Sequence, residues 1–291
     1  MWLFYLSSSL FVQLIKDVRR KKLATKHGVV QSITLEFIVA FLVTAFGVIL
    51  FTDSFYIDKY SIIIFFVGVI DLLGSLGKTK ALTINLASTS VTQSFSPIFP
   101  IILAVIFLGE FQLFNVSTTS GLIKILSLII MPFALTLLRS DKLEGKDKVN
   151  SIWIKSILIM LFFHGLTNFL LKYVMVITNV LRLSVFHRFG KAVASFIVMK
   201  QRGLKLHKKK SFIYLATSNG VLVAITSLLA QLAIATAPLS VYLIIKKPSQ
   251  VVLATLTGFF IYKENKNLSK KETLGFILAA IVLIATVATS I

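Results

Sequence analysis

The 291-residue sequence contains no cysteine. This absence excludes a disulfide framework, a thiol nucleophile and any metal site built on cysteine. Histidine is also scarce, because the chain has four histidines and none of them falls in an HExxH pattern or another metal-ligand spacing. We therefore expect neither a metal site nor another cofactor.

Acidic residues are few, with 11 aspartates and glutamates against 31 lysines and arginines and a formal net charge of +20. In a soluble protein such an excess would suggest nucleic acid as the partner. Here most of the basic residues lie in short segments between apolar runs, which is the charge pattern of membrane proteins. We therefore expect a lipid bilayer around the protein and no nucleic-acid partner.

Charged residues make up only 14% of the chain, hydrophobic residues make up 56%, and the mean hydropathy is +0.89. This composition is too apolar for a soluble domain and is typical of membrane proteins. No stretch shows the alternating pattern of membrane β-strands, so the expected fold class is all-α. Ten runs have about the length of a membrane-spanning helix. They are Trp2–Ile15, Val29–Phe51, Tyr60–Leu76, Leu82–Leu108, Thr119–Leu138, Ile152–Leu171, Ile177–Met199, Ser211–Ala235, Pro238–Tyr262 and Leu274–Ser290.

The two halves of the chain repeat a pattern of glutamate and glycine. Glu110 precedes Gly121, and Glu264 precedes Gly275, with the same spacing inside each pair. Each glutamate ends one apolar run and each glycine opens the next. This repetition predicts two five-helix units, residues 1–138 and residues 152–291, joined by a connecting loop at residues 139–151.

The loops between the runs differ in charge. Numbered along the chain, the odd loops carry 6, 2, 5, 6 and 4 lysines and arginines, with Lys155 counted in the fifth, and the even loops carry at most one each. Because a unit of five spans reverses its orientation when it repeats, this bias follows the side of the membrane and predicts an inverted repeat, the common architecture of secondary transporters. Positive loops lie in the cytoplasm, so ten spans would place both termini outside.

A family resemblance rests on the same region. The run from Ala87 to Pro100, followed by Gly109, Glu110 and Gly121, resembles the motif of EamA-type proteins of the drug/metabolite transporter superfamily. The stretch from Ala237 to Gly275 is similar. The resemblance implies a multi-pass transporter of a bacterial or archaeal cell membrane, with a central cavity between the halves and alternating access. Family members usually have both termini in the cytoplasm, which the loop charges of this chain contradict.

The ninth run carries two lysines and a proline at membrane depth. Lys246 and Lys247 are costly there, so they are candidates for binding an anionic substrate group. Tyr242 and Gln250 lie one turn away on the same helix and share this prediction. Pro248 removes one backbone hydrogen bond and predicts a helix break. The alternative is that one lysine pairs with a buried acid and the other reaches the membrane surface.

Further candidates lie in other runs. Arg182 and Arg188 share the seventh run with His187 and Lys191, and this set forms either a cationic cavity wall or an interfacial stripe. Gln93 and Pro97 lie near the middle of the fourth run, where Pro97 predicts a second helix break. Asn168 belongs to a polar stripe of the sixth run with His164 and Lys172, which predicts that it faces protein or cavity. Each of these predictions follows from the position of the residues within their run.

The acidic residues within the runs are Glu36 and Asp71. Each either pairs with an intramembrane cation or carries the proton of a proton-coupled cycle, and pairing is the favoured role. Glu110 and Glu264 end their runs at the membrane surface, where a structural role as helix caps or bridges is favoured over substrate binding.

No catalytic constellation appears in the sequence, so we do not expect an enzyme. The predicted function is secondary transport, with export favoured, of a small anionic or zwitterionic metabolite. The alternatives are a proton-coupled exporter of cationic drugs that uses Glu36 and Asp71 as ligands, an intramembrane enzyme, and a non-transporting membrane subunit. A homodimer is a candidate assembly.

Overall fold

A computed structural model describes residues 1–51, 57–84, 89, 96–137, 147–175, 179–260 and 270–289. Ten α-helices and one 3-10 helix make up almost all of this part of the chain, which contains no β-strand, so the all-α fold class is confirmed. The helices are α1 (Trp2–His27), α2 (Val29–Phe51), α3 (Lys59–Ile84), α5 (Ile98–Phe107), η1 (Glu110–Phe114), α6 (Thr119–Leu137), α7 (Asp147–Met175), α8 (Val180–Gln201), α9 (Lys210–Thr236), α10 (Leu239–Phe260) and α11 (Lys270–Ala288).

The first helix departs most from the prediction, because α1 continues through His27 instead of ending at Ile15. Residues 16–27 are rich in lysine and arginine, which are good helix formers but too polar for a membrane span. Only Gly28 separates α1 from α2, and its φ of 87° is a left-handed conformation that glycine adopts without strain. The segment predicted as the first loop is therefore the polar second half of a helix.

The fourth predicted run, Leu82–Leu108, does not begin and end in the same helix. Its first residues belong to α3, which continues to Ile84, and its last residues form α5 from Ile98 onward. Pro97 directly precedes α5, as is favourable at a helix start because proline has no N–H to leave unpaired. The structure thus places Pro97 at the beginning of a helix and not within one.

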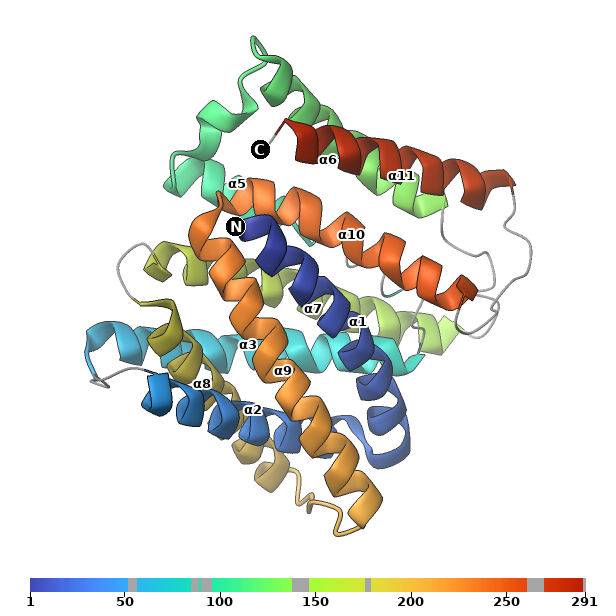
Figure 1. Cartoon of the computed structure of the whole chain (residues 1–291). Coiled ribbons are helices and arrows are strands. Elements are labelled where there is room, and N and C mark those ends of the chain that lie inside the picture. The colour runs from blue at the N-terminus through green and yellow to red at the C-terminus, as the bar shows by residue number, and fades with distance from the viewer. Residues whose placement is uncertain are drawn as a thin grey trace.

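The helices of the two predicted halves pack against each other reciprocally (Figure 1). α3 packs against α7 and α8, and α9 packs correspondingly against α1 and α2. α2 packs against α8, and α6 packs against α11. The α6–α11 pair forms a layer along one edge of the molecule, with α10 between this layer and the remaining helices.

A very close approach between α3 and α8 depends on glycine. A Cβ atom on Gly68 would overlap the backbone of His187, and a Cβ atom on Gly190 would overlap the carbonyl oxygen of Phe65. Small residues allow helix backbones to approach in this way within membranes. This contact brings the next turn of α3, which carries Asp71, directly against α8.

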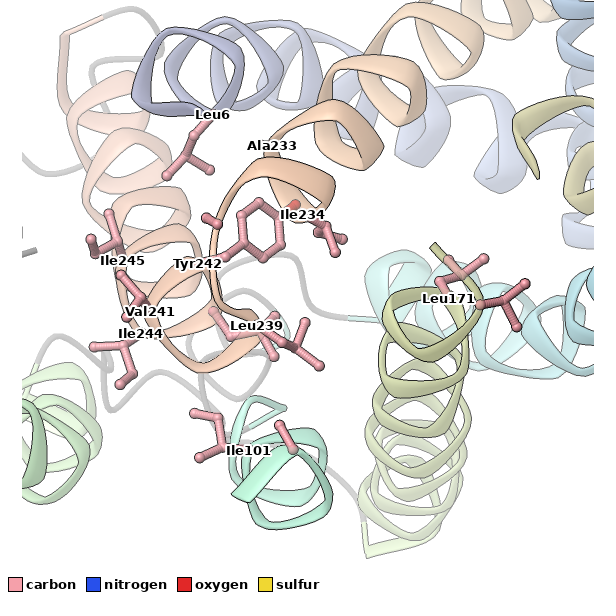
Figure 2. Packing of buried hydrophobic residues seen from close by; sticks show 14 of the residues in the cluster. Leu6, Ile101, Leu171, Ala233, Ile234, Leu239, Val241, Tyr242, Ile244 and Ile245 are labelled. Carbon is pink, nitrogen blue, oxygen red and sulfur yellow. The ribbon is translucent and has the colours of Figure 1, made fainter. Parts of the chain in front are cut away.

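The largest apolar cluster among the described residues is shown in Figure 2. It combines the early turns of α1, α3, α8 and α10 with part of α5 and with the last turns of α7 and α9. Leu6, Leu171, Ile234 and Tyr242 lie within it, and the Tyr242 side chain is fully buried. Helices from both predicted halves therefore meet in one continuous apolar contact.

Within the described part of the chain, four helices are long and apolar enough to cross a bilayer, as judged by length and composition. These helices span Val29–Leu50, Lys59–Ile84, Ser151–Val174 and Lys210–Thr236. Large apolar side chains also remain exposed on them, for example Phe46 and Phe66. Such surfaces are compatible with a membrane protein, because lipid can cover them.

Candidate substrate cavity

A cavity of about 160 Å³ lies between helices of the two predicted halves. α1, α2 and α3 contribute to its wall from the first half, and α7, α8, α9 and α10 contribute from the second. The wall is strongly basic, because six lysines and arginines reach it whereas Asp71 is the one acid among its described lining residues. The six cations are Lys16, Arg20, Lys78, Arg188, Lys191 and Lys246.

The helices that carry these cations are anchored at one end in the apolar cluster, and the cations lie further along the same helices. On α1, Leu10 packs in the apolar cluster, and Lys16 and Arg20 lie further along the same helix and line the cavity. Lys16 and Arg20 are four residues apart and so share one helix face. On α10, the cluster ends at Ile245, and Lys246 lines the cavity.

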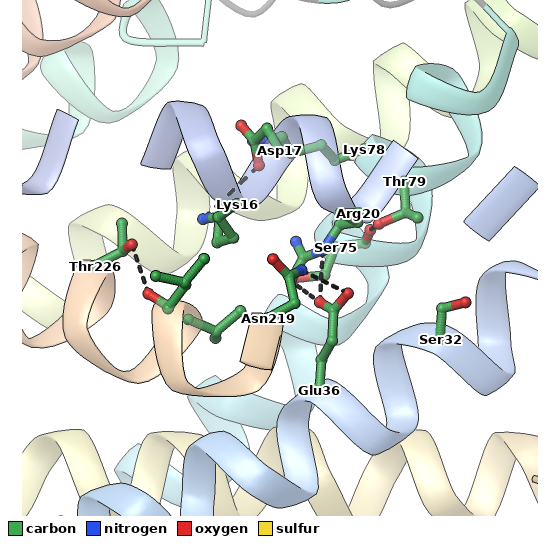
Figure 3. A network of polar contacts seen from close by, with 12 residues as sticks. Lys16, Asp17, Arg20, Ser32, Glu36, Ser75, Lys78, Thr79, Asn219 and Thr226 are labelled. Carbon is green, nitrogen blue, oxygen red and sulfur yellow. Dashed lines mark hydrogen bonds and ion pairs between the residues drawn. The ribbon is translucent and has the colours of Figure 1, made fainter. Parts of the chain in front are cut away.

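Glu36 forms a closed polar network with two partners (Figure 3). The Arg20 guanidinium donates to Glu36 Oε2 from Nε at 2.7 Å and from Nη2 at 2.5 Å. The Asn219 amide on α9 donates to Oε1 at 2.8 Å. The Glu36 side chain is fully buried, so its charge is held by one arginine and one amide and does not itself reach the cavity.

Asp17 partly neutralises a second part of the cavity wall. Lys78 on α3 donates to Asp17 Oδ2 at 2.7 Å, and Lys16 Nζ lies 3.8 Å from Oδ1. Both lysines are buried and line the cavity. One carboxylate therefore lies between two ammonium groups, which leaves this side of the cavity positively charged.

Asp71 is the convergence point of α3, α7 and α8. His164 Nδ1 lies 2.6 Å from Asp71 Oδ1, and His187 Nε2 lies 3.2 Å from Oδ2. Lys191 also forms an ion pair with Oδ2. Asp71 thus holds three groups that can each carry a positive charge, whereas Glu36 holds one charged group and one amide.

Arg188 lies at the same wall with no carboxylate partner among the described residues. Its guanidinium donates to the carbonyl oxygens of Val223 at 3.4 Å and Ala224 at 3.1 Å, and its Nε has no hydrogen-bond partner. The residue is only 3% exposed. A buried guanidinium without an anion is costly, so this charge is positioned to gain from an anion in the cavity.

The candidates on α10 and α7 also reach the cavity. Lys246, Gln250 and Asn168 line it, and Lys246 donates to the Tyr242 hydroxyl. The Lys246 ammonium also lies 4.7 Å from the centre of the Tyr242 ring, within the range of a cation–π contact. Tyr242 therefore orients Lys246 from within the apolar cluster and does not itself line the cavity.

The described carboxylates do not reach every cation of the cavity wall. Asp17, Glu36 and Asp71 contact four of the six, which are Lys16, Arg20, Lys78 and Lys191. Arg188 has no carboxylate partner among the described residues. Because burial strengthens electrostatic interactions, this basic wall favours an anion over a cation as the occupant.

Arg182 lies away from the cavity, at the start of α8. Its Nη2 donates to Asp58 Oδ2 at 2.7 Å, in the segment just before α3. Burial alone would raise the pKa of Asp58, but hydrogen bonds from Ser61 and the charge of Arg182 outweigh burial and lower this pKa. The pair thus joins the ends of two helices, and the structure does not bring Arg182 together with Arg188.

Several predicted residues lie beyond what the structure describes. Gln93 lies outside the described residues, as do the side chains of Lys247 and Pro248. The backbone of α10 nevertheless continues as one helix through position 248, where the sequence predicted a break. Proline removes only one backbone hydrogen bond, and the bonds of the neighbouring turns are sufficient to maintain the helix.

Three cavity cations were missed as site residues because they lie beyond the apolar runs. Lys16, Arg20 and Lys78 were assigned to loops, but they lie in α1 and α3. A usable signal was present, because Asp71, Ser75 and Lys78 follow a spacing of four and three residues that places them on one helix face. Prediction by hydropathy ends a helix at its first charged residues. The helical spacing of polar residues continues past those charges.

Glu110 and Lys172 stabilise helix ends near the apolar cluster. Glu110 accepts hydrogen bonds from the backbone N–H groups of Leu239 at 2.8 Å and Ser240 at 2.9 Å, at the first turn of α10. Lys172 donates to the carbonyl oxygens of Ile234 and Ala237, both at 2.8 Å, at the end of α9. These charges complement the helix dipoles, so Glu110 has the structural capping role predicted for it.

Comparison with known proteins yields similarity in fold only. No family model matches the chain, and no curated protein matches it. Among the solved structures that match, one described only as the crystal structure of a protein has a TM-score of 0.67 and 10% sequence identity, over 98% of this chain and 98% of its own. At this identity the likeness shows a shared fold and says nothing of substrate or activity.

Proposed function

We propose that the protein is a secondary transporter of a small anionic or zwitterionic metabolite, which it moves by alternating access through the central cavity. The observation that carries the proposal is the basic cavity wall, to which six lysines and arginines and one described acid contribute and in which buried Arg188 has no carboxylate partner among the described residues. A buried charge without a counter-ion is costly. An anion that enters this cavity recovers part of that cost, which provides the free energy of binding.

The proposal includes an architecture of ten membrane-spanning helices in two inverted five-helix repeats, residues 1–138 and residues 152–291, with 139–151 as the connection. The reciprocal packing supports it, because α3 contacts α7 and α8 just as α9 contacts α1 and α2. Such reciprocal contacts are expected when two similar units face each other across a pseudo-twofold axis. The resemblance to EamA-type transporters and a multi-pass location in the cell membrane belong to the same proposal.

Export of cationic drugs is less well supported. That function would use Glu36 and Asp71 as ligands for a cation, but Glu36 is engaged by Arg20 and Asp71 by Lys191. A cationic substrate would have to displace these partners and enter a basic cavity. Both steps are unfavourable, since they separate paired charges and bring like charges together.

Purified protein tests the proposal through ligand stabilisation and flux. The panel comprises sulfate, inorganic phosphate, small carboxylates, zwitterionic amino acids and the lipophilic cation tetraphenylphosphonium. We expect at least one anion or zwitterion to raise the melting temperature, because a ligand stabilises the state that it binds. The same compound should cross the membrane of proteoliposomes that contain the protein.

A matched pair of variants separates the cavity from general surface charge. Arg188→Gln removes a cavity cation, and Arg202→Gln removes an exposed arginine just after α8. We expect the first to weaken anion binding by about tenfold or more, which corresponds to one charge-assisted contact of 1.5–3 kcal/mol, and the second to have no effect. Stabilisation by the lipophilic cation alone, or equal loss in both variants, would refute the proposal.

A further inference from the structure

Four buried polar groups in the cavity wall have a hydrogen-bond donor without an acceptor. These four residues form the donor set, and the atoms are Thr167 Oγ1, Arg188 Nε, Gln231 Nε2 and Gln250 Nε2. Thr167 and Gln231 are each 2% exposed, and Arg188 is 3% exposed. A buried donor without a partner is costly and rare in folded proteins. Four such donors around one cavity point to a ligand that supplies acceptor atoms.

Contacts between α8 and α9 hold two members of the donor set in place. The Arg188 guanidinium donates from its two Nη atoms to the carbonyl oxygens of Val223 and Ala224, and its Nε is left without a partner. The Ser184 hydroxyl, one turn earlier on α8, donates to Gln231 Oε1. This bond uses the amide oxygen of Gln231 and leaves the amide nitrogen as the unpartnered end. Both donors are therefore positioned before any ligand binds.

The two predicted halves of the chain contribute differently to the cavity. The donor set lies entirely in the second half, on α7, α8, α9 and α10. The first half contributes the cations Lys16, Arg20 and Lys78, and each of them contacts Asp17 or Glu36. The first half thus presents charges that are already paired, whereas the second half presents donors that are not. The negatively charged group of a ligand is therefore expected on the side of the second half.

Asp71, the one acid among the described lining residues, is not available to hold an ammonium group. Its Oδ1 lies 2.6 Å from His164 Nδ1, and its Oδ2 forms an ion pair with Lys191. His187 Nε2 lies 3.2 Å from the same Oδ2. A ligand ammonium would have to displace Lys191 and remain beside a basic wall, and both are unfavourable. The wall therefore favours an anion over a zwitterion.

The volume of the cavity limits the size of the ligand. It is about 160 Å³, which corresponds to about five water molecules at about 30 Å³ each. This is below the range of about 300–1,000 Å³ that is typical of sites for drug-sized ligands. Acetate, propionate and sulfate are small enough for such a space. The zwitterions glycine and β-alanine are only slightly larger than the matching carboxylates, so charge and not size separates the two classes.

We propose that the donor set binds the oxyanion group of the substrate, and that the substrate is a small anion without an ammonium group. Arg188 supplies a charge-assisted hydrogen bond, and the three neutral donors bind further oxygen atoms. Water can satisfy the neutral donors but cannot neutralise the guanidinium, so an oxyanion gains free energy over water. The inference rests on the proposed transport function and narrows its substrate class to oxyanions.

Pairs of ligands that differ by one ammonium group test this selectivity. Acetate and glycine form one pair, propionate and β-alanine form the other, and sulfate represents inorganic oxyanions. The melting temperature of the purified full chain at each ligand concentration gives the dissociation constant. We expect the anion of at least one pair to bind about tenfold more tightly than its zwitterion, or sulfate to bind about tenfold more tightly than both zwitterions.

Two isosteric threonine variants test the donor set. Thr167→Val removes an unpartnered hydroxyl, and Thr44→Val removes a buried hydroxyl outside the cavity lining that donates to the carbonyl oxygen of Ala40 at 2.7 Å. We expect Thr167→Val to bind the anion about three- to tenfold more weakly, as for one lost hydrogen bond, with an undiminished melting temperature in the absence of ligand. Thr44→Val should bind the anion normally. A residue that only supports the fold would not combine weaker binding with full stability.

A third variant tests whether Gln231 acts as a donor. Gln231→Glu keeps an oxygen for the Ser184 hydroxyl and replaces the donor nitrogen by a second carboxylate oxygen. The new negative charge repels an oxyanion and attracts an ammonium group. We therefore expect the ratio of anion affinity to zwitterion affinity to fall by about tenfold. Melting curves and size-exclusion profiles establish that each variant is folded.

The outcomes separate this inference from the proposed function. Selective binding of an oxyanion that both Thr167→Val and Gln231→Glu weaken supports it. A zwitterion that binds as tightly as the oxyanions, or oxyanion binding that either variant leaves unchanged, overturns the site and leaves the transport function in place. If no anion or zwitterion binds, the transport function is overturned and this inference with it.

Discussion

Glu36 and Asp71, the two acids within the predicted apolar runs, are both buried and both paired, yet their surroundings differ. Glu36 is completely enclosed, and its partners are a guanidinium that keeps its proton and an amide that has no charge. Asp71 lines the cavity and is contacted by two imidazoles and an ammonium group. One centre is closed off from the cavity, and the other belongs to the cavity wall.

This difference separates two kinds of buried charge pair. The Glu36 network joins α1, α2 and α9 through one guanidinium and one amide. The Asp71 centre joins α3, α7 and α8 through two imidazoles and one ammonium group. Burial and pairing alone do not distinguish the two centres, whereas the chemical type of the partners and access to the cavity do.

The largest effect is expected from Glu36→Ala. This change leaves the Arg20 guanidinium buried without its carboxylate, which should reduce the free energy of unfolding by about 3–5 kcal/mol. Thermal or denaturant unfolding of the purified protein measures the loss. Replacing Arg20 by methionine in the same protein should recover part of it, since no uncompensated charge then remains. A Glu36→Ala protein as stable as wild type would contradict the assignment of Glu36 to structure.

Asp71→Asn should cost less stability and more function. The asparagine still accepts hydrogen bonds, and the histidines can remain neutral, so we expect a loss of about 1–3 kcal/mol from the now unpaired Lys191. Anion flux in proteoliposomes should fall, because a neutral amide no longer holds Lys191 in place at the cavity wall. Flux that is unchanged in Asp71→Asn would remove the functional contrast with Glu36.

Unlike the two preceding variants, Arg188→Gln should not lower the stability of the protein. It removes a buried cation that has no described carboxylate partner, so the free energy of unfolding should stay constant or rise by about 1 kcal/mol. The variant should at the same time bind the transported anion more weakly. Melting temperatures with and without the anion measure both effects, and a less stable variant that binds normally would assign Arg188 to structure.

The smallest effect is expected from Asp58→Asn, which serves as a reference outside the cavity. Asparagine preserves the helix cap of α3 but removes the ion pair with Arg182, so we expect a loss of less than about 1 kcal/mol. The folded-state pKa of Asp58 is lowered, so the pair stabilises the protein above about pH 4 and this contribution is lost as the pH falls further. The two proteins should therefore converge in stability on acidification, with no difference in anion flux at neutral pH.

The sequence predicted several elements of the fold closely because they depend on local composition. The second span, Val29–Phe51, was predicted with both ends correct, since a continuous apolar run is bounded by polar residues. The role of Glu110 was also predicted, because a carboxylate at a membrane surface beside helix ends has few other functions. α1 and α3 were predicted too short, because hydropathy does not distinguish a polar loop from a polar stretch of helix.

The cavity could be predicted only in part. Arg188 and Lys191 are three residues apart and line it together, as their spacing suggests, whereas Arg182 on the same helix pairs with Asp58 at its end. Spacing along one helix specifies a face, but not which neighbouring helix that face meets. The sequence therefore identified the charged helix and could not assign the partner of each charge.

By itself, the sequence determined that this chain is helical and suited to a membrane, that its charge is overwhelmingly basic, and that its two acids within the apolar runs need cations. These properties follow from composition and from the cost of burying a charge. Only the tertiary structure decided that Arg20 pairs with Glu36 and that Lys191 and two histidines contact Asp71. It also decided that Arg188 has no described carboxylate partner. The physical reason is that each choice depends on how distant helices pack, which local patterns do not encode.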